Sequence, residues 1–218
     1  MIRLALFDCD GTLVDSQANI CQAMEEAFAA ARLDPPPRTA IRRAVGLSLA
    51  EVIHQLLPDA DAALRARLAQ DYRAIFFQRR EAGAMANEPL FEGIAELLDT
   101  LAEGGWALGV ATGKSDRGLA HILAHHGIAH RFVTLQTADR HPSKPHPAML
   151  EAAMAEAGAD PGATVMIGDT SYDMAMARAG GVRAIGVAWG YHPAAELIAA
   201  GAHDIADDVP ALAAMLAR

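Results

Sequence analysis

The first feature of the chain is a short run of hydrophobic residues near its start. Residues 2–7, IRLALF, are apolar except for Arg3. Such a continuous run suits a strand of a parallel sheet that is covered on both faces, because a half-exposed strand would alternate apolar and polar residues. The pattern therefore predicts a buried strand at residues 2–7.

The pattern changes at residue 16 and keeps its new form to about residue 83. Apolar positions in this segment recur with the spacing of amphipathic helices, most clearly over 18–33, 50–57 and 61–80. The sequence PPPR at 35–38 marks a bend, and no strand pattern interrupts the segment. Residues 16–83 are therefore predicted to form a helical insertion.

From residue 106 onward, short runs rich in β-branched residues alternate with helical stretches. Strands are predicted at 106–112, 131–135, 164–169 and 182–188, with helices such as 118–127 and 146–158 between them. This alternation predicts a parallel sheet to which the first strand also belongs. The expected fold is α/β, a doubly wound parallel sheet formed by a core of residues 1–15 and 84–218, with the helical domain 16–83 inserted.

Composition and charge narrow the classes of function. The 218 residues, 52% of them hydrophobic, can bury a full core, and a formal net charge of −9 argues against a nucleic-acid partner. No apolar stretch approaches the roughly 20 residues of a membrane span, and no secretory signal is recognisable at the N-terminus. We therefore expect a cytoplasmic protein without a membrane partner.

Polar residues with catalytic potential follow the predicted strands. Ligands bind at the carboxyl ends of the strands in open parallel sheets, so these positions are the candidates for a site. The candidates at strand ends are Asp8, Asp10, Thr112, Gly113, Asp169 and Asp173, and the start of the predicted helix at SKPHP adds Lys144.

The stretches that carry these residues also resemble a known family. DCDGTLVDS at 8–16, ATGKS at 111–115, SKPHP at 143–147 and GDTSYD at 168–173 occur in the order of the four motifs of the haloacid dehalogenase-like superfamily of phosphohydrolases. The chain resembles that family from end to end, and within it most resembles the phosphoglycolate phosphatase-like hydrolases. The resemblance implies an enzyme that hydrolyses a small phosphomonoester.

The resemblance also assigns roles to the motif residues. It implies that Asp8 attacks phosphorus and forms an aspartyl phosphate, while Asp10 serves as general acid and base. Lys144 would hold Asp8 and the phosphoryl oxygens together, and Thr112 with the amide of Gly113 would donate hydrogen bonds to those oxygens. Many relatives have a polar side chain at the position of Gly113, so this chain has only a backbone donor there.

Several carboxylates at one point require a cation between them and an incoming phosphate. Mg²⁺ prefers oxygen ligands and fits this need. By resemblance, the ligands would be a side-chain oxygen of Asp8, the backbone carbonyl of Asp10 and the carboxylate of Asp169. Asp173 would lie next to the ion, either as a ligand or as a partner of one.

The position of the helical insertion resembles that of a cap that closes over the site, which implies a small phosphorylated metabolite as partner. Specificity is then expected from the loop RRAVGLSL at 42–49, with Arg42, Arg43, Gly46 and Ser48 as candidates. The two arginines are equally compatible with solvent-exposed helix charges.

Other functions on the same fold stay open. They are a β-phosphoglucomutase-like phosphotransferase, a pyrophosphatase, and a non-catalytic regulatory module that is phosphorylated on Asp8. The regulatory module has no use for the acid/base Asp10 or for a long cap. No pattern in the sequence identifies the phosphate ester or an oligomeric state.

Overall fold

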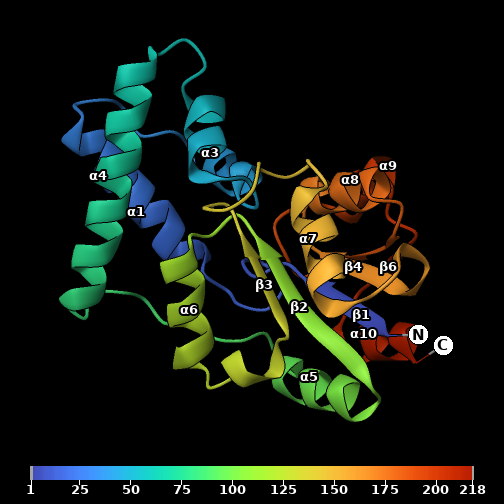
Figure 1. The fold of residues 1–218 in the computed structure, drawn as a ribbon. Helices are drawn as coiled ribbons and strands as arrows, with labels where there is room; N and C mark the ends of the chain where they lie inside the picture. Colours follow the sequence, from blue (N-terminus) through green and yellow to red (C-terminus); the bar gives the residue numbers. More distant parts are fainter. Residues whose placement is uncertain (1, 218) are drawn as a thin grey trace.

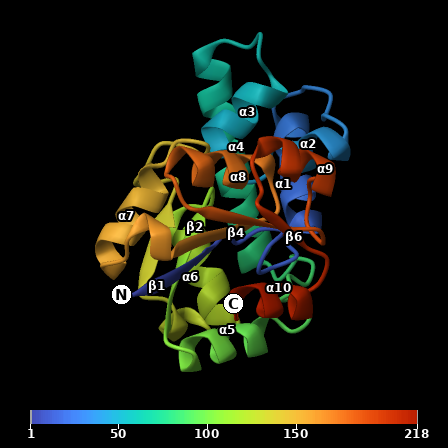
Figure 2. The same ribbon diagram turned by 90° about the vertical axis from the view of Figure 1, so that its right-hand side faces the viewer.

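A computed structural model describes residues 2–217, which form a parallel sheet with helices on both faces and a group of helices beyond the carboxyl ends of the strands. Figures 1 and 2 show this group, α1–α4, on the side toward which the strands run. The strands are β1 (Arg3–Phe7), β2 (Trp106–Thr112), β3 (Thr134–Thr137), β4 (Thr164–Gly168), β5 (Arg183–Val187) and β6 (Asp204–Ala206).

The order of the strands determines where a ligand can bind. The strands lie in the order β3-β2-β1-β4-β5-β6, and all neighbours are parallel. The chain moves outward from β1 to β3 and then returns to place β4 on the other side of β1. The order therefore reverses between β1 and β4, and such a switch point opens a crevice at the carboxyl ends of the strands.

Six helices cover the sheet, three on each face. On one face lie α5 (Ile94–Glu103), α6 (Asp116–His125) and α10 (Val209–Leu216), and on the other lie α7 (Ala148–Ala157), α8 (Ser171–Ala179) and α9 (Ala194–Ala200). Side chains of β1 alternate between the two layers: Phe7 packs in the first and Leu6 in the second, each fully buried. This explains why the strand is apolar throughout.

The inserted helices have a hydrophobic cluster of their own. They are α1 (Gln17–Ala30), α2 (Arg38–Ala44), α3 (Leu49–Leu56) and α4 (Ala62–Glu81). Met24, Phe28, Ile53 and Leu68 are among the buried side chains that hold them together. Two connecting segments join them to the sheet, and these pair with each other: the Asp15 amide donates to the Pro89 carbonyl at 2.9 Å, and the Phe91 amide donates to Leu13 at 3.1 Å.

The structure confirms the predicted α/β fold, with two differences in the strands. The third strand begins at Thr134 rather than at 131, because residues Ala129–Arg131 form a 3₁₀ turn and Arg131 donates to the Ala95 carbonyl at 3.0 Å. The short strand β6 was not predicted, since three residues are too few to show an alternating pattern. Among the helices of residues 2–217, none combines the length and apolarity that crossing a bilayer requires.

Candidate active site

Two of the predicted aspartates lie side by side at the switch point. Asp8 directly follows β1 and Asp169 directly follows β4, and these strands are paired with Phe7 opposite Ile167. The Asp8 amide donates to the Ile167 carbonyl at 2.9 Å, which extends the pairing by one residue. Both aspartates are fully buried. The parallel sheet thus brings together residues that are far apart in the sequence.

The carboxylate of Asp8 is fixed through one oxygen only. Its Oδ1 accepts a hydrogen bond from the Cys9 amide at 2.6 Å and lies 3.0 Å from the Lys144 ammonium. Its Oδ2 is buried and has no hydrogen-bond partner among residues 2–217. A buried carboxylate oxygen is costly to leave without a partner, so a ligand of the site is expected to meet it.

Lys144 also contacts a second carboxylate. Its Nζ donates to Asp173 Oδ1 at 2.6 Å, while Asp173 Oδ2 accepts from the amide and hydroxyl of Thr170 at 3.0 and 2.7 Å. Asp173 and Thr170 thereby form the capping box that starts α8. Burial alone would lower the pKa of Lys144, but Asp173 and Asp8 outweigh that effect and raise it, so the side chain is a fixed positive charge.

Asp169 is held by two donors that are not among the predicted site residues. The hydroxyl of Thr12 donates to Asp169 Oδ1 at 2.9 Å, and the amide of Tyr191 donates to Asp169 Oδ2 at 2.8 Å. Gly11 passes so close that an added Cβ would lie 2.2 Å from Asp169 Oδ2, and its φ of 81° also favours glycine. The glycine of the DGT sequence therefore allows the first loop to pack against Asp169.

Asp8, Asp169 and Asp173 form an acidic cluster that has the composition of a metal site. One carboxylate oxygen from each lies within 4.8 Å of the others, and all three side chains are buried. Burial raises the pKa of Asp8 to about 7, with Lys144 opposing the shift, and burial and the neighbouring carboxylates raise the pKa of Asp169. Three buried carboxylates beside a single lysine leave an excess of negative charge. A hard cation with oxygen ligands would balance it.

Asp10 points in another direction from this cluster. Its Oδ1 lies 2.9 Å from the Lys114 ammonium and accepts a hydrogen bond from the Ser16 hydroxyl. The residue is 7% exposed and borders a cavity above the sheet. Its carboxylate is thus engaged by Lys114 and Ser16, outside the acidic cluster of Asp8, Asp169 and Asp173. If Asp10 also binds the metal ion, it would have to do so through its backbone carbonyl.

The other predicted phosphate-binding residues lie at the end of β2. Thr112 is buried, and its Oγ1 accepts from the Lys114 amide at 3.2 Å. Gly113 lies against the inserted segment: a Cβ on it would be 2.2 Å from the Leu47 carbonyl oxygen and 2.8 Å from that of Gly46. The absence of a side chain at residue 113 therefore allows the loop at 45–48 to rest on the end of β2.

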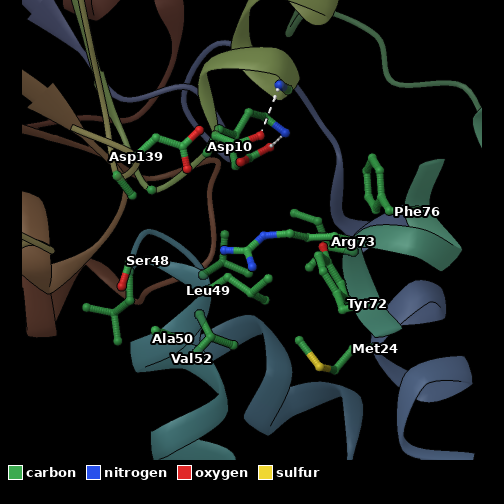
Figure 3. Close-up of a pocket in the computed structure, with 18 of the residues that line it drawn as sticks. Asp10, Met24, Ser48, Leu49, Ala50, Val52, Tyr72, Arg73, Phe76 and Asp139 are labelled. Atoms are coloured by element: carbon green, nitrogen blue, oxygen red, sulfur yellow. Dashed lines mark hydrogen bonds and ion pairs between the residues drawn. The ribbon is translucent and has the colours of Figure 1, made fainter. Parts of the chain in front are cut away.

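A cavity of about 490 Å³ separates this end of the sheet from the inserted helices, and we call it the cap pocket. Asp10, labelled in Figure 3, borders it from the sheet together with Gly113 and Lys114, and core residues of 115–118 and 138–139 line it as well. Residues of α1, α3, α4 and the loop 45–48 line it from the inserted segment. Of the four specificity candidates, Gly46 and Ser48 line the pocket.

Arg42 and Arg43 do not line the cap pocket. Arg42 lies beside Cys21 of α1. Arg43 forms an exposed two-bond ion pair with Glu196 of α9, with N–O distances of 3.0 and 2.7 Å. The carbonyl of Arg43 also accepts from Tyr172 of α8 at 3.0 Å. Arg43 thus joins the inserted helices to the core.

Several site residues were not identified from the sequence. Lys114 is one of only two lysines in the chain and lies within ATGKS, a signal that could have identified it. In α4, Tyr72, Arg73 and Phe76 line the cap pocket, whereas only Leu68 and Ala69 of that helix are buried. The aromatic and basic residues that lie side by side in 61–80 are a weaker signal of a binding site, because amphipathic helices commonly contain both.

Comparisons with known proteins agree with this geometry. The family described as haloacid dehalogenase-like hydrolase matches residues 5–187. The "probable phosphatase IndB" of Dickeya dadantii is 38% identical over 211 residues, which cover 95% of this chain and 90% of that protein. A phosphoglycolate phosphatase of Rhodospirillum rubrum is 30% identical over 224 residues, which cover 97% and 90% of the two chains.

A solved structure shows the same fold. A haloacid dehalogenase-like hydrolase from Bacteroides fragilis superimposes with a TM-score of 0.89 at 26% identity, covering 97% of this chain and 100% of that one. The family match, the two relatives and this structure all span both the sheet and the inserted helices. The chain therefore belongs to the haloacid dehalogenase-like hydrolase family and is an enzyme of its phosphatase class, as its motifs predict.

Proposed function

We propose that this protein hydrolyses a small organic phosphomonoester by transferring the phosphoryl group to Asp8 and then to water. The observation that carries the proposal is the state of the Asp8 carboxylate. Lys144 and the Cys9 amide fix one oxygen, and the other has no partner among residues 2–217. A carboxylate held in one orientation with a free oxygen is suited to attack phosphorus.

The first step breaks the ester bond. As an oxygen of Asp8 bonds to phosphorus, the bond from phosphorus to the ester oxygen breaks, and Asp10 gives a proton to that oxygen. In the second step Asp10 takes a proton from water, the water oxygen bonds to phosphorus, and the bond to Asp8 breaks. Lys114 and Ser16 hold Asp10 in position for both transfers.

The site residues also fit a Mg²⁺ ion. Asp8, Asp169 and Asp173 supply the oxygen donors that this ion prefers, and the excess of buried carboxylates supports a cation there. When bound, the ion would neutralise charge on the carboxylates and the phosphoryl group. Lys144 adds a fixed positive charge, and the amide of Gly113 and the hydroxyl of Thr112 are available as donors to phosphoryl oxygens.

We further infer that residues 16–83 act as a cap domain on the core of residues 1–15 and 84–218. The separate hydrophobic cluster of α1–α4 and the paired connecting segments support this division. The cap pocket lies between the two parts, so closure would exclude water from the reaction. A small phosphorylated metabolite fits this arrangement, and the phosphoglycolate phosphatase among the relatives makes phosphoglycolate one ester to test.

Two substitutions and one chelation experiment test the mechanism with para-nitrophenyl phosphate. Asp8→Asn should abolish turnover, and excess EDTA should abolish it reversibly, with recovery on adding Mg²⁺. Asp10→Asn should slow turnover and leave phosphate bound to Asp8, which mass spectrometry of the intact protein would detect. The matched control is Asp15→Asn, because Asp15 belongs to the same motif but is exposed.

Three outcomes would contradict the proposal. Full turnover by Asp8→Asn would exclude Asp8 as nucleophile, and full turnover in EDTA would exclude the metal. Transfer of the phosphoryl group to a second alcohol without release of phosphate would favour the phosphotransferase alternative.

A further inference from the structure

The cap pocket has a larger volume than the smallest substrates of this family need. Cavities of about 300–1,000 Å³ hold drug-sized ligands, and this one measures about 490 Å³. Phosphoglycolate has only a two-carbon chain beyond its phosphate, so most of the cavity would stay filled with water. A well-matched substrate has a larger organic part.

The walls of the pocket show what that organic part should be. Tyr72 and Phe76 of α4 form one side, with ring centroids 5.7 Å apart, and Figure 3 shows Met24 next to Tyr72, with Leu49 and Val52 across the pocket from Phe76. These side chains offer few hydrogen bonds. A sugar body would lose hydration of its hydroxyl groups there without compensation, whereas a flat apolar ring would gain from burial.

One charged group extends between these walls. The guanidinium of Arg73 reaches from α4 into the middle of the pocket (Figure 3), and no hydrogen bond or ion pair joins it to the other residues drawn there. The other basic groups of the pocket have nearby partners. Lys114 pairs with Asp10, while Arg80 and Arg117 lie over the rings of Phe76 and Phe77 at 5.2 and 4.0 Å.

The charge of the lining points to an anion in addition to the phosphate. Arg73, Arg80, Lys114 and Arg117 outnumber the two acidic residues that line the pocket, in a chain whose net charge is −9. The phosphoryl group has its own cation in Lys144, which pairs with Asp8 and is not among the residues that line the pocket. Arg73 enters from the helices above the sheet, so it is placed to meet a different part of the substrate.

From these observations we propose that the preferred substrate is a phosphomonoester whose organic part contains a flat apolar ring and a carboxylate. The ring lies between Tyr72 and Phe76 on one side and the aliphatic residues on the other, and Arg73 pairs with the carboxylate. This inference rests on the phosphatase function proposed above and adds the substrate class and a specificity-determining residue.

Three alkyl phosphates separate the two recognition elements while keeping the ester chemistry similar. Benzyl phosphate has the ring alone, phosphoglycolate has the carboxylate alone, and para-carboxybenzyl phosphate has both. In the presence of Mg²⁺, kcat/KM of the unaltered protein should be highest for para-carboxybenzyl phosphate. Arg73→Gln should lower that value by about tenfold or more, the effect of one lost charged hydrogen-bonded pair, and leave benzyl phosphate nearly unchanged.

The matched control is Arg67→Gln, which changes another exposed arginine of α4, whose ion pair within residues 2–217 is with Asp71 on the same helix. It should leave the ranking of all three esters unchanged. Because Arg73 is exposed, its replacement is expected to fold, and the melting temperature of both variants checks this.

Each other outcome has a definite meaning. A preference for phosphoglycolate, or equal rates for all three esters, would overturn the substrate class. Equal losses for the three esters in Arg73→Gln would show that Arg73 binds the phosphoryl group instead and would overturn its assignment. Hydrolysis of none of them, nor of para-nitrophenyl phosphate, would overturn the phosphatase function itself, a result distinct from hydrolysis without preference.

Discussion

Replacing Gly113 with alanine should separate the cap from the end of β2. The added methyl carbon would lie 2.2 Å from the carbonyl oxygen of Leu47 and 2.8 Å from that of Gly46. Non-bonded carbon contacts are favourable at about 3.5–4.0 Å, so the loop 45–48 must retreat by about 1 Å or more. Both clashing atoms belong to the backbone, and a change of side-chain rotamer therefore gives no relief.

The expected effect follows from what the loop borders. Gly46 and Ser48 line the cap pocket, and a displacement of about 1 Å near a reacting group can cost up to about 100-fold in rate. We expect kcat/KM for para-nitrophenyl phosphate to fall by about 10- to 100-fold, equivalent to about 1.4–2.8 kcal/mol. Unfolding free energy should fall by about 1 kcal/mol, the low end for an overpacked site, because the loop can move away.

The assay compares steady-state kinetics with urea denaturation for Gly113→Ala and a control. Gly162→Ala is the control, since a Cβ there meets no atom within 4 Å. If Gly113→Ala keeps the kcat/KM and the urea midpoint of the unaltered protein, the loop does not rest on residue 113 during catalysis and the reasoning is refuted.

Two further substitutions test the contacts of the site and of the cap. Lys144→Met should destabilise the metal-free protein by about 3 kcal/mol or more in urea, because Asp8 and Asp173 would lose their shared buried cation; an unchanged midpoint would contradict this. Arg43→Ala should give a small loss of kcat/KM that is equal for every phosphate ester, since its partner is Glu196 of the core; a loss confined to one ester would instead place Arg43 beside the substrate.

The sequence alone determined the fold class and the acidic groups that lie at the carboxyl ends of the strands. The apolar run before Asp8 and the β-branched run before Asp169 are local patterns, and parallel pairing then brings their ends together. The burial of Asp8 and Asp169 follows from their position at the ends of the central strands β1 and β4. Short elements were less predictable, because three residues of β6 contain too little periodicity.

Only the tertiary structure decided which basic residues face the pocket. Arg43 and Arg73 both lie on amphipathic helices, and nothing in the residues around them distinguishes their roles. Arg43 meets Glu196, 153 positions later in the chain, whereas Arg73 extends into the cap pocket. Backbone pairing fixes where the strand ends lie. The direction of a side chain between the inserted helices and the core depends instead on how these two parts pack, and the local sequence does not encode that packing.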